Sequence, residues 1–261
     1  MGPQRKKIVR GLGLLAYVLA ACLGVFWLRP TYLLSILVVL APPALVNWSW
    51  LGPARRRVLV FSLVTVAFFA PPVELISRLA DAWDVQSVLP RPFGVLPLEN
   101  LIFAFLNFFW GLSFYEYFVA GDRRHGVSRR FRTLIGLYLL LDIVVFGVFS
   151  WDRRLAGVSY LWTGLLVLVA PAALIFWRRP ELLRRVWLPT LFFAAVFFSY
   201  EYVSLCIGSW WWPGHYLMPT KLCGRVFPLD DVLVWYLLST PALIAGYEFF
   251  AVGGAARSQD L

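Results

Sequence analysis

Eight apolar stretches, each long enough to cross the roughly 30 Å hydrocarbon core of a bilayer, follow one another along this chain of 261 residues. They cover approximately residues 8–28, 31–48, 58–80, 97–119, 131–150, 158–177, 186–207 and 227–252. Only 15% of the residues are charged, whereas a soluble domain usually carries about a quarter. The sequence therefore predicts an all-α integral membrane protein with about eight transmembrane helices, in a single domain over residues 1–261.

Lysine and arginine residues gather in every second loop between these stretches. The basic loops cover residues 5–7, 55–57, 123–132 and 178–185, with Arg257 near the C-terminus. The intervening loops hold only scattered cations, namely Arg29, Arg91, Arg153, Arg154, Lys221 and Arg225. Because cytoplasmic loops retain lysine and arginine, we expect both termini on the cytoplasmic side of a bacterial-type plasma membrane. The loops 81–96 and 208–226 then face outward.

The charge pattern and the few histidines and cysteines limit the partners of this chain. The net charge of +10 fits contact with anionic lipid headgroups. It does not indicate a nucleic-acid partner, because the basic clusters are loop-length and no soluble domain carries them. The scattered histidines and cysteines predict no metal site, and no cofactor is expected. Cys206 and Cys223 flank the loop 208–226, where an oxidising compartment permits a disulfide, although two free thiols are equally compatible with the sequence.

Four landmarks occur twice along the chain in the same order. They are an Ala-Pro pair before a tryptophan, a glutamate nine residues before a tryptophan, a Pro-Leu-acid helix start and a Tyr-Glu pair. The landmarks fall at residues 41–48, 74–83, 97–99 and 115–116, and again at 170–177, 201–210, 228–230 and 247–248. Self-similarity of this kind indicates internal repeats.

The landmarks define two repeats of three helices each, over residues 31–119 and 158–252. Three spans reverse the direction of a chain, and the connecting helix at 131–150 restores it, so that the two repeats run parallel. The stretch 8–28 is a leading helix. Parallel membrane repeats usually share a binding site at their interface, and we expect any functional site of this chain to lie there.

Five acidic residues fall near one level in the outer half of the predicted bundle. Glu74 and Glu201 lie inside the third and seventh stretches, and Glu99, Asp230 and Asp231 lie at the starts of the fourth and eighth. Ionisable groups inside apolar spans are costly and suggest function. A buried carboxyl group without a cationic partner keeps its proton more readily, as a general acid must. We therefore expect Glu74, Glu99, Glu201 and Asp230 to converge in one lipophilic cavity between the repeats.

Acids at helix ends also have simpler explanations. An acidic residue after a proline at a helix start complements the helix dipole, and this alternative applies to Glu99 and Asp230. It does not apply to Glu74 and Glu201, which lie inside their helices. The glutamates of the two Tyr-Glu pairs, at the opposite ends of the spans, are expected at the cytoplasmic interface.

Aromatic residues surround the acidic level in both repeats. Aromatic faces stabilise cations, so that an acid beside an aromatic wall in an apolar cavity suits a proton-initiated cyclisation of a polyene. Tryptophan and tyrosine also form belts at every membrane interface, which is the alternative for each single residue. The candidate substrate-binding residues are Trp83, Asn100, Phe103, Trp210 and Trp235.

Together these motifs resemble the membrane lycopene cyclases of bacterial, archaeal and fungal type, over most of residues 31–250. The resemblance implies cofactor-free cyclisation of the ends of a linear carotenoid, through protonation of a terminal double bond, ring closure and loss of a proton. It also implies Glu99 and Asp230 as the principal acids and bases, with Glu74, Glu201 and Asp231 in support. Asn100 stands where the family usually has a second acid, and Asp230 where it usually has glutamate.

Other functions remain compatible with the sequence. Fungal membrane cyclases of meroterpenoids share this layout, so that another polyprenyl substrate is an alternative. A small-solute transporter with parallel repeats and a non-catalytic membrane subunit are two further ones. The partners expected for a cyclase are a lipophilic polyene substrate and membrane lipid. Assembly into a homo-oligomer, the ring type and the number of ends cyclised are left open.

Overall fold

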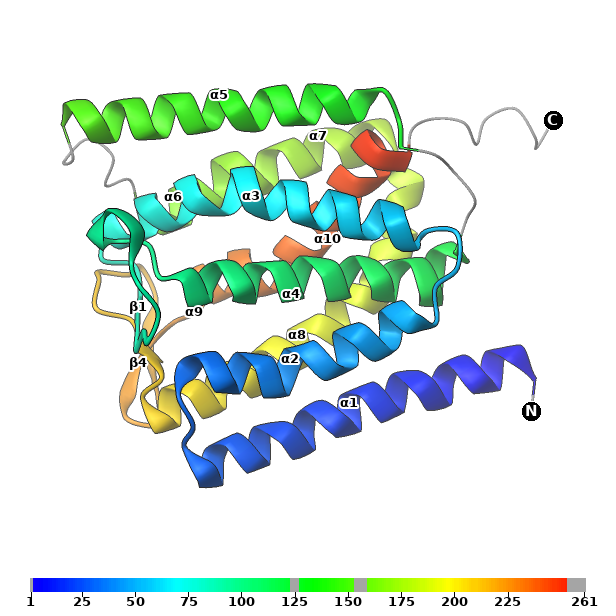
Figure 1. Cartoon of the computed structure of the whole chain (residues 1–261), viewed down its shortest axis with the longest axis horizontal. Coiled ribbons are helices and arrows are strands. Elements are labelled where there is room, and N and C mark those ends of the chain that lie inside the picture. Colours follow the sequence, from blue (N-terminus) through cyan, green and yellow to red (C-terminus); the bar gives the residue numbers. More distant parts are fainter. Residues whose placement is uncertain (1, 123–126, 153–158, 253–261) are drawn as a thin grey trace.

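The computed structural model describes residues 2–122, 127–152 and 159–252. Within these ranges, eight helical spans are long and apolar enough to cross a membrane, and they form one bundle (Figure 1). The chain is therefore an all-α integral membrane protein. The eight stretches predicted from hydropathy are confirmed as helical spans, although the seventh begins at Pro180 rather than near residue 186.

The spans differ in how regular they are. The first five are α1 (Pro3–Leu28), α2 (Tyr32–Ser49), α3 (Arg55–Leu79), α4 (Leu98–Phe114) continued by the π-helix η2 (Tyr115–Ala120), and α5 (Arg130–Trp151). The sixth joins α6 (Tyr160–Thr163), the π-helix η4 (Gly164–Val169) and α7 (Ala170–Arg178), and the seventh joins η5 (Pro180–Leu182) and α8 (Leu183–Ile207). The eighth joins α9 (Leu229–Val232), η6 (Leu233–Leu237), α10 (Ser239–Gly246) and η7 (Tyr247–Val252).

Two of the π-helical turns, η4 and η6, lie at a close approach between spans. A bilayer core contains no water to pair with loosened backbone groups, so neighbouring elements must satisfy them, and π-turns occur frequently at functional sites. Gly164 begins η4, and a Cβ atom there would lie 2.6 Å from Val234 and 3.0 Å from Trp235. Only glycine therefore allows η4 and η6 to come this close, and the contact fixes Trp235 against the sixth span.

The helices are arranged around α4, which packs against α2 and α3. The long helix α8 packs against α1 and α10. On the flanks of the bundle, α1 lies across α2 and α8, whereas α5 lies along α3 on the opposite side (Figure 1). The core is apolar, as burial inside a bilayer requires, and includes the fully buried Trp110 and Phe193.

Short strands join the loops at one end of the bundle, on the left in Figure 1. The strands β1 (Asp84–Val85) and β2 (Trp210–Trp211) pair antiparallel, with Asp84 opposite Trp211. The strands β3 (Pro219–Leu222) and β4 (Arg225–Pro228) form a hairpin. A disulfide joins Cys206 to Cys223, with their Cα atoms 5.2 Å apart, and ties the end of α8 to this hairpin. Of the two alternatives open from the sequence, the structure has the disulfide.

At the other end of the bundle, the two Tyr-Glu pairs exchange hydrogen bonds. The Tyr115 hydroxyl donates to Glu248 Oε1 at 2.7 Å, and the Tyr247 hydroxyl donates to Glu116 Oε1 at the same distance. Arg57 Nη2 lies 2.6 Å from Glu116 Oε1. Both glutamates are 0% exposed, so protein surrounds their side chains, and their depth at the membrane interface stays a prediction. Their tyrosine partners come from the other half of the chain, which sequence spacing does not reveal.

This buried ion pair generates a stability prediction. Arg57→Met keeps an apolar side chain of similar length but leaves Glu116 as an uncompensated buried charge, a change that typically costs about 3–5 kcal/mol. We expect a correspondingly lower free energy of unfolding for the purified protein in detergent. The neighbouring Arg56 is exposed, and Arg56→Met should leave stability almost unchanged. Equal stability of the two variants would contradict a structural role for the pair.

Candidate functional site

A cavity of about 470 Å³ lies between the helices in the interior of the bundle. Its wall is mostly apolar and aromatic, and it includes residues from both predicted repeats and from α5. Two acidic residues line it, Glu74 from α3 and Glu201 from α8. All five candidate substrate-binding residues also line it, namely Trp83, Asn100, Phe103, Trp210 and Trp235.

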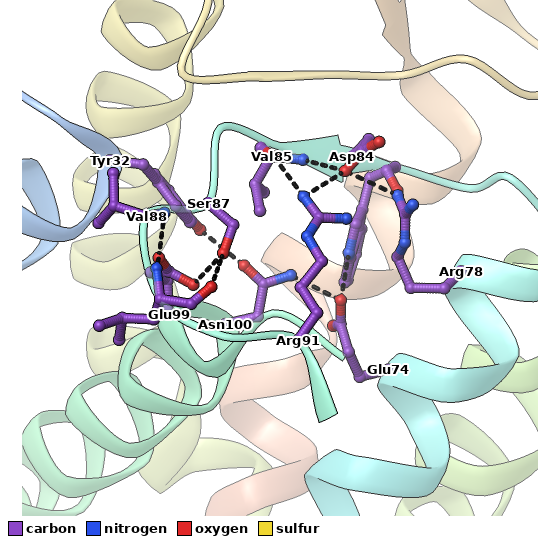
Figure 2. A network of polar contacts seen from close by, with 12 residues as sticks. Tyr32, Glu74, Arg78, Asp84, Val85, Ser87, Val88, Arg91, Glu99 and Asn100 are labelled. Carbon is purple, nitrogen blue, oxygen red and sulfur yellow. Dashed lines mark hydrogen bonds and ion pairs between the residues drawn. The ribbon is translucent and has the colours of Figure 1, made fainter. Parts of the chain in front are cut away.

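Glu74 is 5% exposed and is held by two donors on a single oxygen. The Trp83 indole nitrogen donates to Oε1 at 3.1 Å, and Asn100 Nδ2 donates to the same oxygen at 2.7 Å. Asn100 Oδ1 in turn accepts a bond from the Tyr32 hydroxyl at 3.1 Å (Figure 2). Among the described residues, no hydrogen-bond partner is found for Oε2 of Glu74. The carboxyl group is thus fixed by one oxygen, while the other remains available to a molecule in the cavity.

Glu201 is fully buried and is held by three donors on both oxygens. The indole nitrogens of Trp210 and Trp212 each donate to Oε1 at 2.9 Å. The Tyr236 hydroxyl donates to Oε2. An ionised carboxylate only accepts hydrogen bonds, whereas a protonated one also donates. The three donors around Glu201 therefore suit a carboxylate.

The nine-residue spacing between glutamate and tryptophan has a direct structural meaning in both halves. In each case the helix ends shortly after the glutamate, and the following loop folds back so that the indole nitrogen reaches the carboxyl group. The two loops also pair with each other: β1 directly follows Trp83, β2 begins at Trp210, and the two strands are antiparallel partners. The repeated spacing thus predicts a real contact.

Glu99 and Asp230 occupy a different position from the one expected. Both are buried, but neither lines the cavity. Glu99 Oε1 accepts the backbone N–H groups of Val88 and Leu89, each at 2.7 Å, and Oε2 accepts the Ser87 hydroxyl at 2.7 Å (Figure 2). The expected convergence of four acids in one cavity is therefore found for Glu74 and Glu201 only.

Asp230 repeats this arrangement in the second half. Its carboxylate accepts the backbone N–H groups of Leu217 and Met218, at 3.0 and 3.3 Å. In both halves, an acid at the start of a helix thus holds the preceding loop. Glu99 and Asp230 are therefore equivalent positions in the two halves. Asp231 lies in α9, but its side chain is outside the described part of the structure.

Cations stay at the rim of the site. Arg78 Nη1 and Arg91 Nη2 lie 2.8 and 3.1 Å from Asp84 Oδ1 (Figure 2). Among the described residues, neither Glu74 nor Glu201 forms an ion pair with lysine or arginine. No group of three or more His, Cys, Asp or Glu side chains in the same part of the chain could hold a metal ion.

Several residues of the site cannot be recognised from spacing in the sequence. Tyr236 contacts Glu201 across 35 residues, and Tyr32 contacts Asn100 across 68. The sequence gives a partial indication of two of them, because a Tyr-Leu pair begins both the second and the sixth span. The tyrosines of these pairs, Tyr32 and Tyr160, both line the cavity. Tyr160 stacks on Trp235 with ring centroids 4.3 Å apart, and meets the Trp83 ring edge to face at the same distance.

No family model matches this sequence, and neither the curated proteins nor the solved structures contain a match to it.

The geometry predicts that Glu99 and Asp230 each stabilise their own loop. Glu99→Ala orphans two backbone donors, each worth about 1–3 kcal/mol when left unpaired. We expect faster hydrogen exchange in residues 85–97, measured by mass spectrometry, with little change in residues 212–228. Asp230→Ala should show the reverse pattern. Unchanged exchange in both loops would contradict this assignment.

Proposed function

We propose that this chain is an intramembrane cyclase of a linear polyene, of the lycopene type, that works without a cofactor. The observation that carries the proposal is the pair of buried acids, Glu74 and Glu201, in one apolar and aromatic cavity. A proton donor and a proton acceptor are the only reactive groups that such an isomerisation needs. The cavity wall is mostly apolar, with a few uncharged polar side chains such as Thr65, Asn107 and Thr240 away from the two acids, and a wall of this kind fits a hydrocarbon substrate better than a small polar solute.

The different surroundings of the two acids support different roles. We assign the acid to Glu74, because its Oε2 can carry a proton toward the cavity. We assign the base to Glu201, because its three donors fit a carboxylate. The proton of Glu74 adds to the terminal double bond, and the next double bond attacks the resulting carbocation and closes the ring. Glu201 removes a proton from the ring to form the new double bond, and that proton must return to Glu74 before the next turnover.

The aromatic wall provides the remaining requirement of this reaction. A carbocation inside an apolar cavity has no water to solvate it, and aromatic faces stabilise cations there without reacting as bases. Trp83, Tyr160 and Trp235 form one continuous aromatic group beside Glu74, in which Tyr160 stacks on Trp235 and meets Trp83 edge to face. Beside Glu201, Trp210 contacts the rings of Tyr32 and Phe103, at centroid distances of 5.6 and 5.8 Å.

The proposal assigns Glu99 and Asp230 a role different from the one that the family resemblance implies. Both act as positioning residues, since they hold the loops that carry the tryptophan donors of Glu74 and Glu201. Asn100, where the family usually has an acid, orients Glu74 through its amide nitrogen. The reacting acids are then the two glutamates inside the spans.

We further propose that the two halves are parallel repeats and that both termini are cytoplasmic. The reciprocal Tyr-Glu hydrogen bonds, the two Glu-Trp contacts and the paired loops support the repeats. The basic ends of α1, α3 and α5 lie at the end of the bundle where η7 finishes (Figure 1). The disulfide lies at the opposite end, which supports an oxidising compartment on that side.

The role of Glu74 is tested by exchanging its carboxyl group for an amide. Glu74→Gln keeps the acceptor oxygen for Trp83 and Asn100 but removes the transferable proton. General acid catalysis contributes about 10²–10⁴-fold, so cyclised product should fall to traces in lycopene-accumulating cells, as measured by pigment chromatography.

The matched control is Glu99→Gln, which alters a neighbouring buried acid outside the cavity. It should keep far more activity at equal protein level. Full activity of well-folded Glu74→Gln protein would refute the proposed acid, and loss of activity in Glu99→Gln alone would return that role to Glu99. A panel of other linear polyprenyl substrates tests the substrate class in parallel.

A further inference from the structure

The two flanking helices, α1 and α5, occupy equivalent places in the two halves of the bundle. α5 begins at Arg130, which is 127 residues after Pro3 at the start of α1, the same spacing that separates Glu74 from Glu201. α1 packs against α8 of the other half, and α5 packs against α3. Each half is therefore better described as four helices than as three, and α5 is the counterpart of the leading helix.

The counterparts differ in one respect. α1 packs along α2, the next helix in its own half, and closes the seam between them. Among the described residues, α5 makes at most isolated contacts with α6, η4 and α7, the corresponding next span. The cavity reaches into this looser seam, because residues of α5 and of the sixth span line it, whereas no residue of α1 does.

Exposure locates the opening of the cavity. Of all the residues that line it, two are exposed, Leu137 on α5 and Pro171 on α7. Leu137 is 51% exposed. Leu137 lies seven residues after the start of α5 at Arg130, and Pro171 lies seven residues before the end of α7 at Arg178. At 1.5 Å per residue, both lie about 10 Å from the same end of the bundle, a depth that falls inside the hydrocarbon core.

We propose that the seam between Leu137 and Pro171 is a lateral mouth through which a long hydrocarbon chain enters the cavity directly from the bilayer. The identity of that chain as a polyene rests on the function proposed above. An apolar opening at this depth faces lipid tails, so that a molecule dissolved in the membrane reaches it without crossing water. A polar solute has no such access.

The extent of the cavity indicates how the chain lies. Along α3 the lining runs from Glu74 to Phe61, which is about 20 Å of helix at 1.5 Å per residue. One end of a linear chain can therefore contact both acids while the rest extends toward the mouth. The remainder stays among the lipid tails, so that the site accepts molecules longer than the cavity. The ligand class is a long, unbranched or methyl-branched hydrocarbon whose reacting end carries no polar headgroup.

The mouth is tested by closing it after the protein has folded. Leu137→Cys introduces a reactive thiol, since Cys22 is buried and the other two cysteines are paired. The purified variant is modified with a bulky maleimide in detergent, where water reaches the thiol more readily than in a bilayer. Complete modification is confirmed by mass spectrometry before the protein is reconstituted in lipid vesicles. We expect it to lose most of its uptake and cyclisation of lycopene supplied in the bilayer. Leu140 is 58% exposed on the same helix but does not line the cavity, and modified Leu140→Cys should keep both.

A loading experiment separates a closed mouth from a damaged site. If Leu137→Cys protein binds lycopene before modification, the bound molecule should still be cyclised once, and later turnovers should stop. Binding is measured independently, as lycopene that co-purifies with the protein. Slower binding in a protein that never cyclises lycopene would support the mouth and reject the proposed function.

If the modified Leu137→Cys and Leu140→Cys proteins take up and cyclise lycopene at equal, undiminished rates, the mouth is rejected and the proposed function is retained. Absence of lycopene binding by the unmodified protein would overturn both, because the cavity would then have no hydrocarbon ligand to admit.

Discussion

A polar group that this chain places inside the bilayer can be stabilised only by a partner within the protein. The hydrocarbon core supplies no water, and an unsatisfied group there costs several kcal/mol. The buried carboxyl groups obey this rule in three ways. Glu116 meets Arg57 and Tyr247, Glu99 and Asp230 take backbone N–H groups of their loops, and Glu74 and Glu201 take indole nitrogens. The partners of Glu116 lie far away in the sequence and join helices, whereas the contacts cited for the other four carboxyl groups fix the loop next to each helix.

The two ends of the bundle are held more firmly than its middle. At the end with the strands, the paired loops and the disulfide tie the halves together and each loop to its helix. At the other end, the reciprocal Tyr-Glu bonds connect η2 with η7. Between these anchors the spans can separate around a cavity without loss of the overall arrangement. The looser seam beside α5 is tolerated for the same reason, because lipid tails can contact its apolar walls.

The sequence predicts some of these features well and others poorly, for physical reasons. The eight spans follow from hydropathy alone, which is a local property of the chain. The contact of Glu74 with Trp83 could be anticipated, because two residues nine apart around a helix end meet with little freedom. The partners of Glu99 could not be anticipated. The sequence does not tell whether a buried acid at a helix start faces a cavity or accepts hydrogen bonds from the backbone of a neighbouring loop. The burial of Glu116 depends on Tyr247, 131 residues away, and only the folded bundle brings them together.

If the two halves are repeats, as proposed, they differ at the positions that decide what each glutamate can do. Trp212 stands 127 residues after Val85, the spacing that relates Trp83 to Trp210. Tyr236 stands 131 residues after Phe105, the spacing that relates Glu99 to Asp230. Valine and phenylalanine cannot donate hydrogen bonds, so Glu74 lacks the two extra donors that surround Glu201.

An amide at Asn100 replaces those donors and engages the same oxygen as Trp83, which leaves the second oxygen of Glu74 open to the cavity. On the proposed function, two carboxyl groups that share the Glu-Trp contact thereby differ in role: Glu74 is suited to give a proton and Glu201 to take one.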